Sequence, residues 1–183
     1  MNIFQLSLDP VVAATMAVDK HVVKMPTETV QMLSTNLHLK DIDEDWMYKS
    51  FNPNHPSTAW ARQSKENYTW LVEHGIALCA EYTKRYGKVH KCEAKIKKAL
   101  PFADLMPNKP YSRITLVMPA QFHTIDPVHS YRMFYAASKF KFATWKTEEP
   151  MWWKEYRQLV QTYNMECVNE KDDGLRSLKQ RHG

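Results

Sequence analysis

Residues 11–37 read VVAATMAVDKHVVKMPTETVQMLSTNL. Their apolar side chains recur at helical spacing, at positions 11, 12, 16, 18, 22 and 23 and again at 30, 32 and 33. Pro26 interrupts the run, and a proline should bend or break a helix because it lacks the N–H and crowds the preceding turn. The stretch therefore predicts one kinked helix, or two abutting helices, from about Val11 to Leu37.

The remaining chain predicts further helices between turns and irregular segments. A turn cluster at 52–56 precedes a helix over 59–86, which Ser57 or Thr58 could cap and Gly87 ends. The other expected elements are an acidic loop or short helix start at 41–45, a basic helix at 88–100, an irregular segment at 101–127 with at most a short extended piece at 114–117, a helix from 127 to about 146 capped by Asp126, and a helix opening at 149–150.

These elements predict an all-α fold, a compact single-domain helical bundle over residues 1–165 with a polar, flexible C-terminal tail at 166–183. A chain of 183 residues with 44% apolar side chains usually keeps one core. The longest uncharged apolar stretch, 10–18, is far below the ~20 residues that cross a bilayer. With no secretory leader and three scattered cysteines, the sequence favours a cytoplasmic protein without membrane contact, disulfide framework or zinc site.

One candidate site lies within the first long helix. His21 and Glu28 are seven residues apart, two helical turns, so both can lie on one face, with Asp19 and Lys20 beside them. A carboxylate in an apolar helix has its neutral form favoured by desolvation, which suits general acid/base work. The spacing is equally compatible with an exposed Glu28 and a hydrogen-bonded interior His21.

A second candidate site follows the turn cluster. His55, helix-start hydroxyls and Arg62 one turn on could bind an anion at a helix N-terminus, with Trp60 and Asn67 nearby. A capped helix with ordinary core aromatics explains the same residues. No metal-ligand spacing joins the eight histidines, so neither a metal nor a cofactor is expected, although a hydrolase built from Asp19 and several histidines stays open.

Two further segments combine cations with either few acids or many aromatic residues. The net charge is +5, and residues 84–98 hold seven cations against one carboxylate, which attracts phosphates or simply makes a solvated helix face. The second segment interleaves aromatic and basic residues, which can stack bases and contact a backbone or can pack as core. Its candidate residues are Lys139, Lys141, Trp152, Trp153, Lys154 and Tyr156.

Four motifs in the same order make the chain similar to the phage pyrimidine-dimer DNA glycosylase/AP-lyase family of the endonuclease V type. They are the N-terminal stretch 3–6, Asp19 and His21 followed by Glu28, the helix end CAEYTKRYG at 79–87, and PMWWKEY at 150–156. The resemblance covers most of residues 1–160. It implies the compact helical fold of that family, a DNA substrate with a damaged or modified base, and a phage protein working in the host cytoplasm.

The resemblance also implies a mechanism. In that family the N-terminal amine attacks C1′ of the target nucleotide and expels the base, and a Glu stabilises the charge that develops on the sugar. An α-amine has a pKa near 8, so a useful fraction is neutral at pH 7. Here the roles fall to Met1 and Glu28, with His21 orienting Glu28 or a phosphate. Asn2 is too large for usual methionine removal, so Met1 should keep its place.

On this interpretation Lys24, Arg62, Lys139, Lys141 and Lys154 contact phosphates, and Trp152, Trp153 and Tyr156 pack against the nucleic acid or behind the site. The family matches Lys141 and the aromatic-basic end but lacks the His55 to Asn67 constellation. The family has arginines where this chain has Asn2, Thr27 and, approximately, Gln31, so the substrate carries over less well than the fold. Two alternatives therefore stay open: an enzyme of this fold that acts on a free nucleotide or nucleoside, and a non-catalytic binder of nucleic acid or protein. The sequence leaves the oligomeric state open.

Overall fold

The computed structural model describes residues 1–166, and these are helical, with no β-strand among them. This confirms the predicted all-α fold. Residues 167–183, nearly all of the predicted tail, lie outside the described part. The elements are α1 (Pro10–Thr15), α2 (Asp19–His38), α3 (Pro56–Ala61), α4 (Lys65–Tyr86), α5 (Glu93–Ala99), the 3-10 helices η1 (Leu100–Leu105) and η2 (Ala120–Phe122), α6 (Pro127–Ser138) and α7 (Trp152–Thr162).

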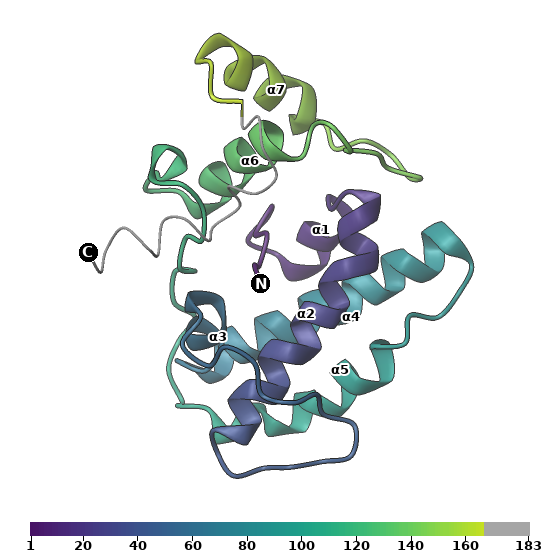
Figure 1. The fold of residues 1–183 in the computed structure, drawn as a ribbon, viewed down its shortest axis with the longest axis vertical. Helices are drawn as coiled ribbons and strands as arrows, with labels where there is room; N and C mark the ends of the chain where they lie inside the picture. The colour runs from purple at the N-terminus through teal and green to yellow at the C-terminus, as the bar shows by residue number, and fades with distance from the viewer. Residues whose placement is uncertain (167–183) are drawn as a thin grey trace.

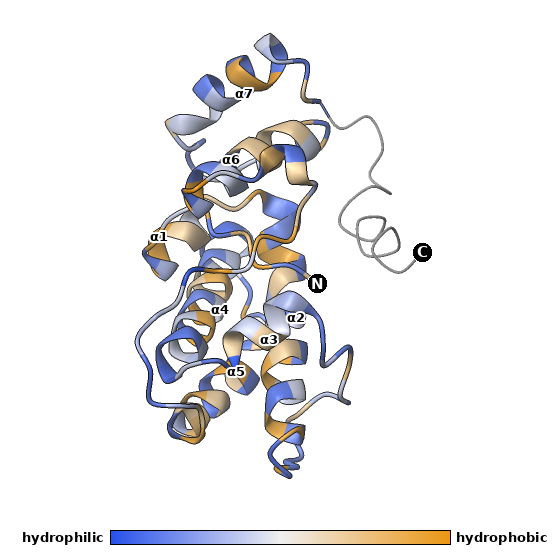
Figure 2. Cartoon of the chain, turned by 90° about the vertical axis from the view of Figure 1, so that its left-hand side faces the viewer, coloured by the Kyte–Doolittle hydropathy of each residue, from blue (hydrophilic) through white to orange (hydrophobic). Residues whose placement is uncertain are grey.

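The helices form two groups with the N-terminus between them (Figure 1). In the larger group α2 packs along α4, α3 and α5 cover that pair, and α1 packs against α4. The smaller group is α6 with α7. A quarter turn away, Figure 2 again separates α6 and α7 from the larger group, with the chain's start at the junction. The start of the chain therefore lies where the two groups meet.

The first residues are part of the core. Ile3 and Leu6 are fully buried, although this segment forms no helix. Trp70 on α4 donates its indole N–H to the Leu8 carbonyl (2.7 Å), and Arg132 on α6 donates to the Leu6 carbonyl (3.0 Å). Because both helix groups bind this segment, its position is fixed from both sides.

The helix break in residues 11–37 is not at the proline. α2 runs continuously through Pro26, and the chain instead leaves helical geometry between Thr15 and Asp19. Arg85 at the end of α4 donates to the carbonyls of Thr15 (2.9 Å) and Ala17 (2.7 Å). The predicted break at Pro26 is therefore wrong, although two helices do cover this stretch. A buried cation satisfies the carbonyls at the real break, whereas Pro26 removes only one helical hydrogen bond.

The predicted helix over 59–86 is in fact two helices. α3 has His55 as its cap, with Nδ1 accepting from the Ser57 N–H (3.2 Å), so neither Ser57 nor Thr58 caps it. Ser64 caps α4 by accepting from the Asn67 N–H. Gly87 ends α4 at φ +66°, as predicted, because this left-handed position suits a residue without Cβ.

Of three other predicted helix boundaries, the start of α6 is confirmed, whereas the start of α5 and the end of α6 are wrong. α5 starts at Glu93 rather than 88, since His90 turns the chain by accepting from the Cys92 N–H (3.1 Å). α6 has the predicted Asp126 cap but stops at Ser138, well before 146. The segment after α6 instead folds back, and the Lys146 N–H donates to Asp19. No helix within residues 1–166 is long and apolar enough to cross a membrane.

Candidate active site

Asn2 anchors the start of the chain. Its side-chain amide donates to the Val117 carbonyl (2.9 Å) and its side-chain oxygen accepts from the Ile3 N–H (2.8 Å) and from the Tyr131 hydroxyl (3.3 Å). All polar groups of this side chain thus serve the fold. The result is that Met1 extends from a fixed point.

Glu28 on α2 contacts the anchored Asn2. The Asn2 main-chain N–H donates to Glu28 Oε2 (3.1 Å). The carboxylate thus contacts the residue that follows Met1. The other oxygen, Oε1, pairs with Lys24 Nζ (3.0 Å), whose side chain is 70% exposed while that of Glu28 is 12% exposed. The carboxylate is therefore nearly buried yet held by few partners.

Met1 and Glu28 line one cavity of about 250 Å³. Its walls combine polar and aromatic groups from the chain start, α2, α6 and the segment before α3. The remaining lining residues are Asn2, Phe4, His21, Lys24, Met25, Phe51, Asn52, His55, Val117, Phe134 and Lys139. The cavity thus brings together six of the residues predicted from the sequence: Met1, His21, Lys24, Glu28, His55 and Lys139.

His21 is a neutral ring in a fixed orientation. It stacks on Phe4 (ring centroids 4.5 Å apart), and its Nδ1 lies 2.8 Å from the Tyr135 hydroxyl. That hydroxyl also accepts from the Val18 N–H, which leaves its own proton available to His21 Nδ1. Burial, then the charges of Lys139 and Lys24, lower the pKa of His21 well below its usual value. When the hydroxyl gives its proton to Nδ1, the ring proton of neutral His21 is on Nε2.

His55 has the same tautomer for a different reason. Its Nδ1 accepts from the Ser57 N–H, so a neutral ring carries its proton on Nε2. Burial and then the positive N-terminal amine lower the pKa of His55 to about 4, against the opposing influence of Glu28. Both the amine and Glu28 thus lie close enough to act on this ring. The cavity is therefore lined by two neutral imidazoles, and the Nε2 group of His55 is a donor.

The predicted lysines occupy different surroundings. Lys139 is buried against the cavity, with its ammonium over the rings of Phe4 (5.8 Å) and Phe134 (5.4 Å). Lys141 is exposed and lies over the Phe140 ring (6.0 Å), outside the cavity lining. Lys154 is exposed on α7. Only Lys24 and Lys139 of this set border the cavity.

Three predicted binding residues belong to the packing behind the cavity. Trp60 is fully buried and donates to the Ser112 carbonyl (3.0 Å). Asn67 is buried and donates to the Trp60 carbonyl (2.9 Å). Arg62 donates to the Pro53 carbonyl (2.7 Å) and to Asn36. Their hydrogen bonds hold α3, α4 and the preceding segment together.

The aromatic residues of α7 pack between the helices. The indole N–H of Trp152 lies 3.3 Å from Met16 Sδ, and Trp153 meets Trp145 edge to face (5.0 Å). Both tryptophans are buried, and the hydroxyl of Tyr156 lies 3.0 Å from His129 Nδ1. None of them lines the cavity, so their observed contacts are with the fold.

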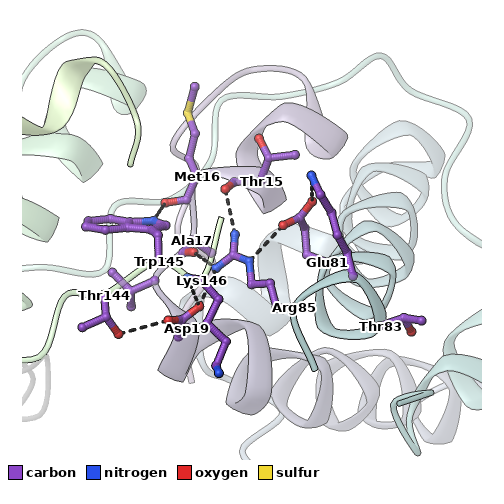
Figure 3. A network of polar contacts seen from close by, with 12 residues as sticks. Thr15, Met16, Ala17, Asp19, Glu81, Thr83, Arg85, Thr144, Trp145 and Lys146 are labelled. Atoms are coloured by element: carbon purple, nitrogen blue, oxygen red, sulfur yellow. Dashed lines mark hydrogen bonds and ion pairs between the residues drawn. The ribbon is translucent and has the colours of Figure 1, made fainter. Parts of the chain in front are cut away.

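Asp19 lies outside the cavity lining, in a separate buried network (Figure 3). The Arg85 guanidinium, with no exposed side-chain surface, donates to Glu81 Oε2 (2.9 Å) and to Asp19 Oδ1 (3.2 Å). Thr144 and the Lys146 N–H also donate to Asp19. The basic segment that contributes Arg85 is thus partly structural, while Lys88, Lys91 and Lys98 are exposed. Within the described residues, no cluster of three histidine, cysteine or acidic side chains could hold a metal ion.

Sequence reasoning missed Phe4, Phe51 and Asn52 as cavity residues and the anchoring role of Asn2. Asn2 had one usable signal, since it adjoins the candidate nucleophile. Phe51 had none, because an exposed aromatic residue before a turn resembles any surface residue. Its place in the cavity depends on contacts between segments distant in sequence.

A family model described as pyrimidine dimer DNA glycosylase matches residues 1–94, just over half of the 183 residues. Comparisons with curated proteins and with solved structures found no match. The helical fold and the matched region, which includes Met1, Glu28 and His55, define an enzyme of DNA repair, a DNA glycosylase whose substrate is DNA. The chain belongs to the pyrimidine dimer DNA glycosylase family.

Proposed function

We propose that this enzyme removes a damaged or modified base from duplex DNA with the Met1 amine as nucleophile, Glu28 as acid/base and an AP-lyase step afterwards. The observation that carries the proposal is the 3.1 Å hydrogen bond from the Asn2 N–H to Glu28, together with the cavity that Met1 and Glu28 share. This chemistry requires an amine nucleophile close to a carboxylate. Here the nearly buried Glu28 carboxylate binds Asn2, the residue next to the Met1 amine.

The proposed reaction changes three bonds at C1′. The Met1 nitrogen forms a bond to C1′ as the glycosidic bond breaks, and the electron pair leaves with the base, which takes up a proton that the attached nitrogen loses. The C1′–O4′ bond then opens, O4′ takes up the second proton of the nitrogen, and an imine results. In the lyase step a base removes a proton from C2′ and the 3′ phosphate leaves. Glu28 stabilises positive charge on the sugar, accepts the protons from nitrogen and C2′, and passes protons on to the base and to O4′.

His55 and His21 have proposed roles as fixed donors. A neutral His55 lines the same cavity as Met1 and Glu28 and carries its proton on Nε2, which suits a hydrogen bond to the departing base. His21, oriented by Tyr135, suits a phosphate or the sugar. Neutral rings matter here because a third positive charge beside the amine and Lys139 would disfavour an iminium.

The predicted DNA contacts stay part of the proposal. Lys24 and Lys139 border the cavity and are the nearest candidates for phosphates, with Lys141 and Lys154 farther out. Arg62, Trp60 and Asn67 support the site through packing, and Trp152, Trp153 and Tyr156 support α6. No metal or cofactor takes part in these steps.

The test is borohydride trapping. The protein is incubated with a duplex containing one natural abasic site, borohydride reduces any imine to a stable amine, and peptide mass spectrometry locates the adduct. The proposal requires the adduct on the α-nitrogen of Met1. Acetylation of that nitrogen should abolish trapping. An adduct on a lysine, or no adduct while a control lyase is trapped, would refute the amine mechanism.

A second candidate is a free nucleotide or nucleoside as substrate. The cavity is small, about 250 Å³, and Asn2 is engaged in anchoring rather than in binding a backbone. Salt dependence separates the two substrates, because duplex binding that neutralises several phosphates weakens steeply from about 50 to 200 mM salt. Turnover of a free nucleotide or nucleoside that is indifferent to salt in this range would favour the small substrate.

A further inference from the structure

The segment 51–55 has no regular secondary structure, but buried groups hold its start. The Phe51 N–H donates to Thr35 Oγ1 on α2 (3.0 Å), and that hydroxyl in turn donates to the Gln31 carbonyl of the same helix (2.7 Å). Thr35 is fully buried. The main chain of Phe51 is therefore tied through its N–H to one rigid helix.

The rest of the segment is held as firmly. Asn52 has a left-handed φ of +51°, a conformation that asparagine tolerates better than most residues. Its carbonyl accepts from the His55 N–H (3.1 Å), and Arg62 binds the carbonyl of Pro53 (2.7 Å). These hydrogen bonds hold the turn between Phe51 and His55 in one conformation.

The side chain at the head of this turn is left open to solvent. Phe51 is 55% exposed, yet it lines the same cavity as Met1, Glu28 and His55. Exposed apolar surface costs free energy, and a phenylalanine can usually find cover in a flexible loop. Here the anchored backbone prevents that, so an aromatic face is held in a set position at the reactive centre.

We infer that the Phe51 ring stacks on the base that flanks the reactive nucleotide and so holds the duplex open at that step. This inference rests on the proposed function. Bringing C1′ to an amine inside a cavity requires the duplex to be distorted there, which uncovers the face of a neighbouring base. Aromatic side chains stack on any base, and apolar side chains inserted at a base step stabilise a kink. Phe51 is thus a positioning residue, and its effect should not depend on which base is excised.

The test measures binding without chemistry. The two probes are a duplex with a tetrahydrofuran abasic analogue, which cannot form an imine, and the intact duplex of the same sequence. Fluorescence anisotropy at one fixed salt concentration gives both dissociation constants. Phe51→Ala should weaken binding of the tetrahydrofuran duplex by about tenfold and leave intact-duplex binding within about twofold. Phe51→Trp should keep the preference for the tetrahydrofuran duplex.

Tyr163→Ala is the matched control, since Tyr163 is 65% exposed but lies outside the cavity lining. It should leave both constants unchanged. Equal weakening of both duplexes by Phe51→Ala, or no weakening of either, overturns the stacking role. If wild-type protein is not trapped on a natural abasic site but Phe51→Ala still selectively loses the tetrahydrofuran duplex, the amine mechanism fails and the stacking role stands.

Discussion

Two carboxylates of α2, Asp19 and Glu28, are almost equally buried and yet have different partners. Their side chains are 10% and 12% exposed. Asp19 accepts from Arg85 (3.2 Å), from the Lys146 N–H (3.0 Å) and from Thr144 (3.1 Å). Glu28 has a chain-end N–H and the ammonium of an exposed lysine. Burial alone therefore does not mark a reactive carboxylate.

The difference lies in how the acceptor capacity is used. A carboxylate has about four lone-pair sites. The donors on Asp19 come from α4 and from 144–146, and they join α1, α2, α4 and the segment after α6 at one point (Figure 3). The donors on Glu28 leave one side open to a cavity. Saturation by distant elements makes a structural ion, whereas partial saturation beside a cavity leaves a group able to accept a proton.

Breaking the reactive carboxylate should have the largest effect. Glu28→Gln keeps an oxygen for the Asn2 N–H and removes the charge, so we expect cleavage of an abasic duplex to slow by about 10²–10⁴-fold with a nearly unchanged melting temperature. Single-turnover gel assays measure the rate. Asp19→Asn serves as the counterpart and should leave the rate per folded molecule unchanged. Full turnover by the Glu28 variant would rule out its role.

Breaking the structural network should act on stability instead. Arg85→Met leaves the Asp19 and Glu81 carboxylates and the Thr15 and Ala17 carbonyls without their buried donor, so we expect a loss of roughly 3–5 kcal/mol in the free energy of unfolding. Urea denaturation measures it. Lys84→Met, an exposed neighbour 3.8 Å from Glu81, should cost less than about 1 kcal/mol. Equal losses for both variants would contradict the contrast.

A smaller effect should separate the two steps of catalysis. His55→Ser keeps an N-cap for α3, because serine caps well, and removes the Nε2–H donor. Release of the base from ultraviolet-irradiated duplex should slow by about 10²-fold, the usual cost of one lost donor, while trapping on an abasic duplex should change far less. A Gln at this position retains a donor and should recover part of the rate. Equal slowing of both steps would remove His55 from base departure.

A graded effect is expected on the acid side of the stability profile. Burial lowers the pKa of His74 to about 4, and that of His55 is also about 4, against about 6.5 in the unfolded chain. The unfolded state therefore binds more protons in this window, so stability should be full above pH 6.5 and fall as the pH drops toward 4. Each ring contributes at most about 1.4 kcal/mol per pH unit. Melting temperatures of wild type and His74→Phe at pH 7, 5.5 and 4.5 should show a shallower decline for the variant.

Much of the helical fold follows from local patterns, because caps and apolar periodicity act within a few residues. Asp126 and Gly87 were read correctly for this reason. The break at Pro26 was not, since the real interruption depends on Arg85, some 70 residues away in sequence. The prediction of a single helix over 59–86 also missed the boundary between α3 and α4, where His55 caps α3 and Ser64 caps α4.

The candidate site divides in the same way. His21 and Glu28 could be paired by their spacing, which places both on the cavity side of α2. Trp60 and Asn67 could not be assigned, because aromatic and amide side chains of the same types serve cores and ligand sites alike; here their hydrogen bonds are internal. Phe51 was invisible to sequence reasoning, since its importance comes from Thr35 and from a cavity built by distant segments.

Because Asn2 is anchored, the number of residues before it determines how far the terminal amine lies from Glu28. Because the main chain and side chain of Asn2 are both fixed, the proposed mechanism makes the Met1 amine a reagent on a one-residue tether, with the high effective concentration that such a tether provides. On the same mechanism, one glycine added before Met1 would displace the amine by up to about 3.8 Å, beyond the carboxylate it must reach. Reactivity would then depend on the position of a main-chain amine, and not on the kind of side chain that stands there.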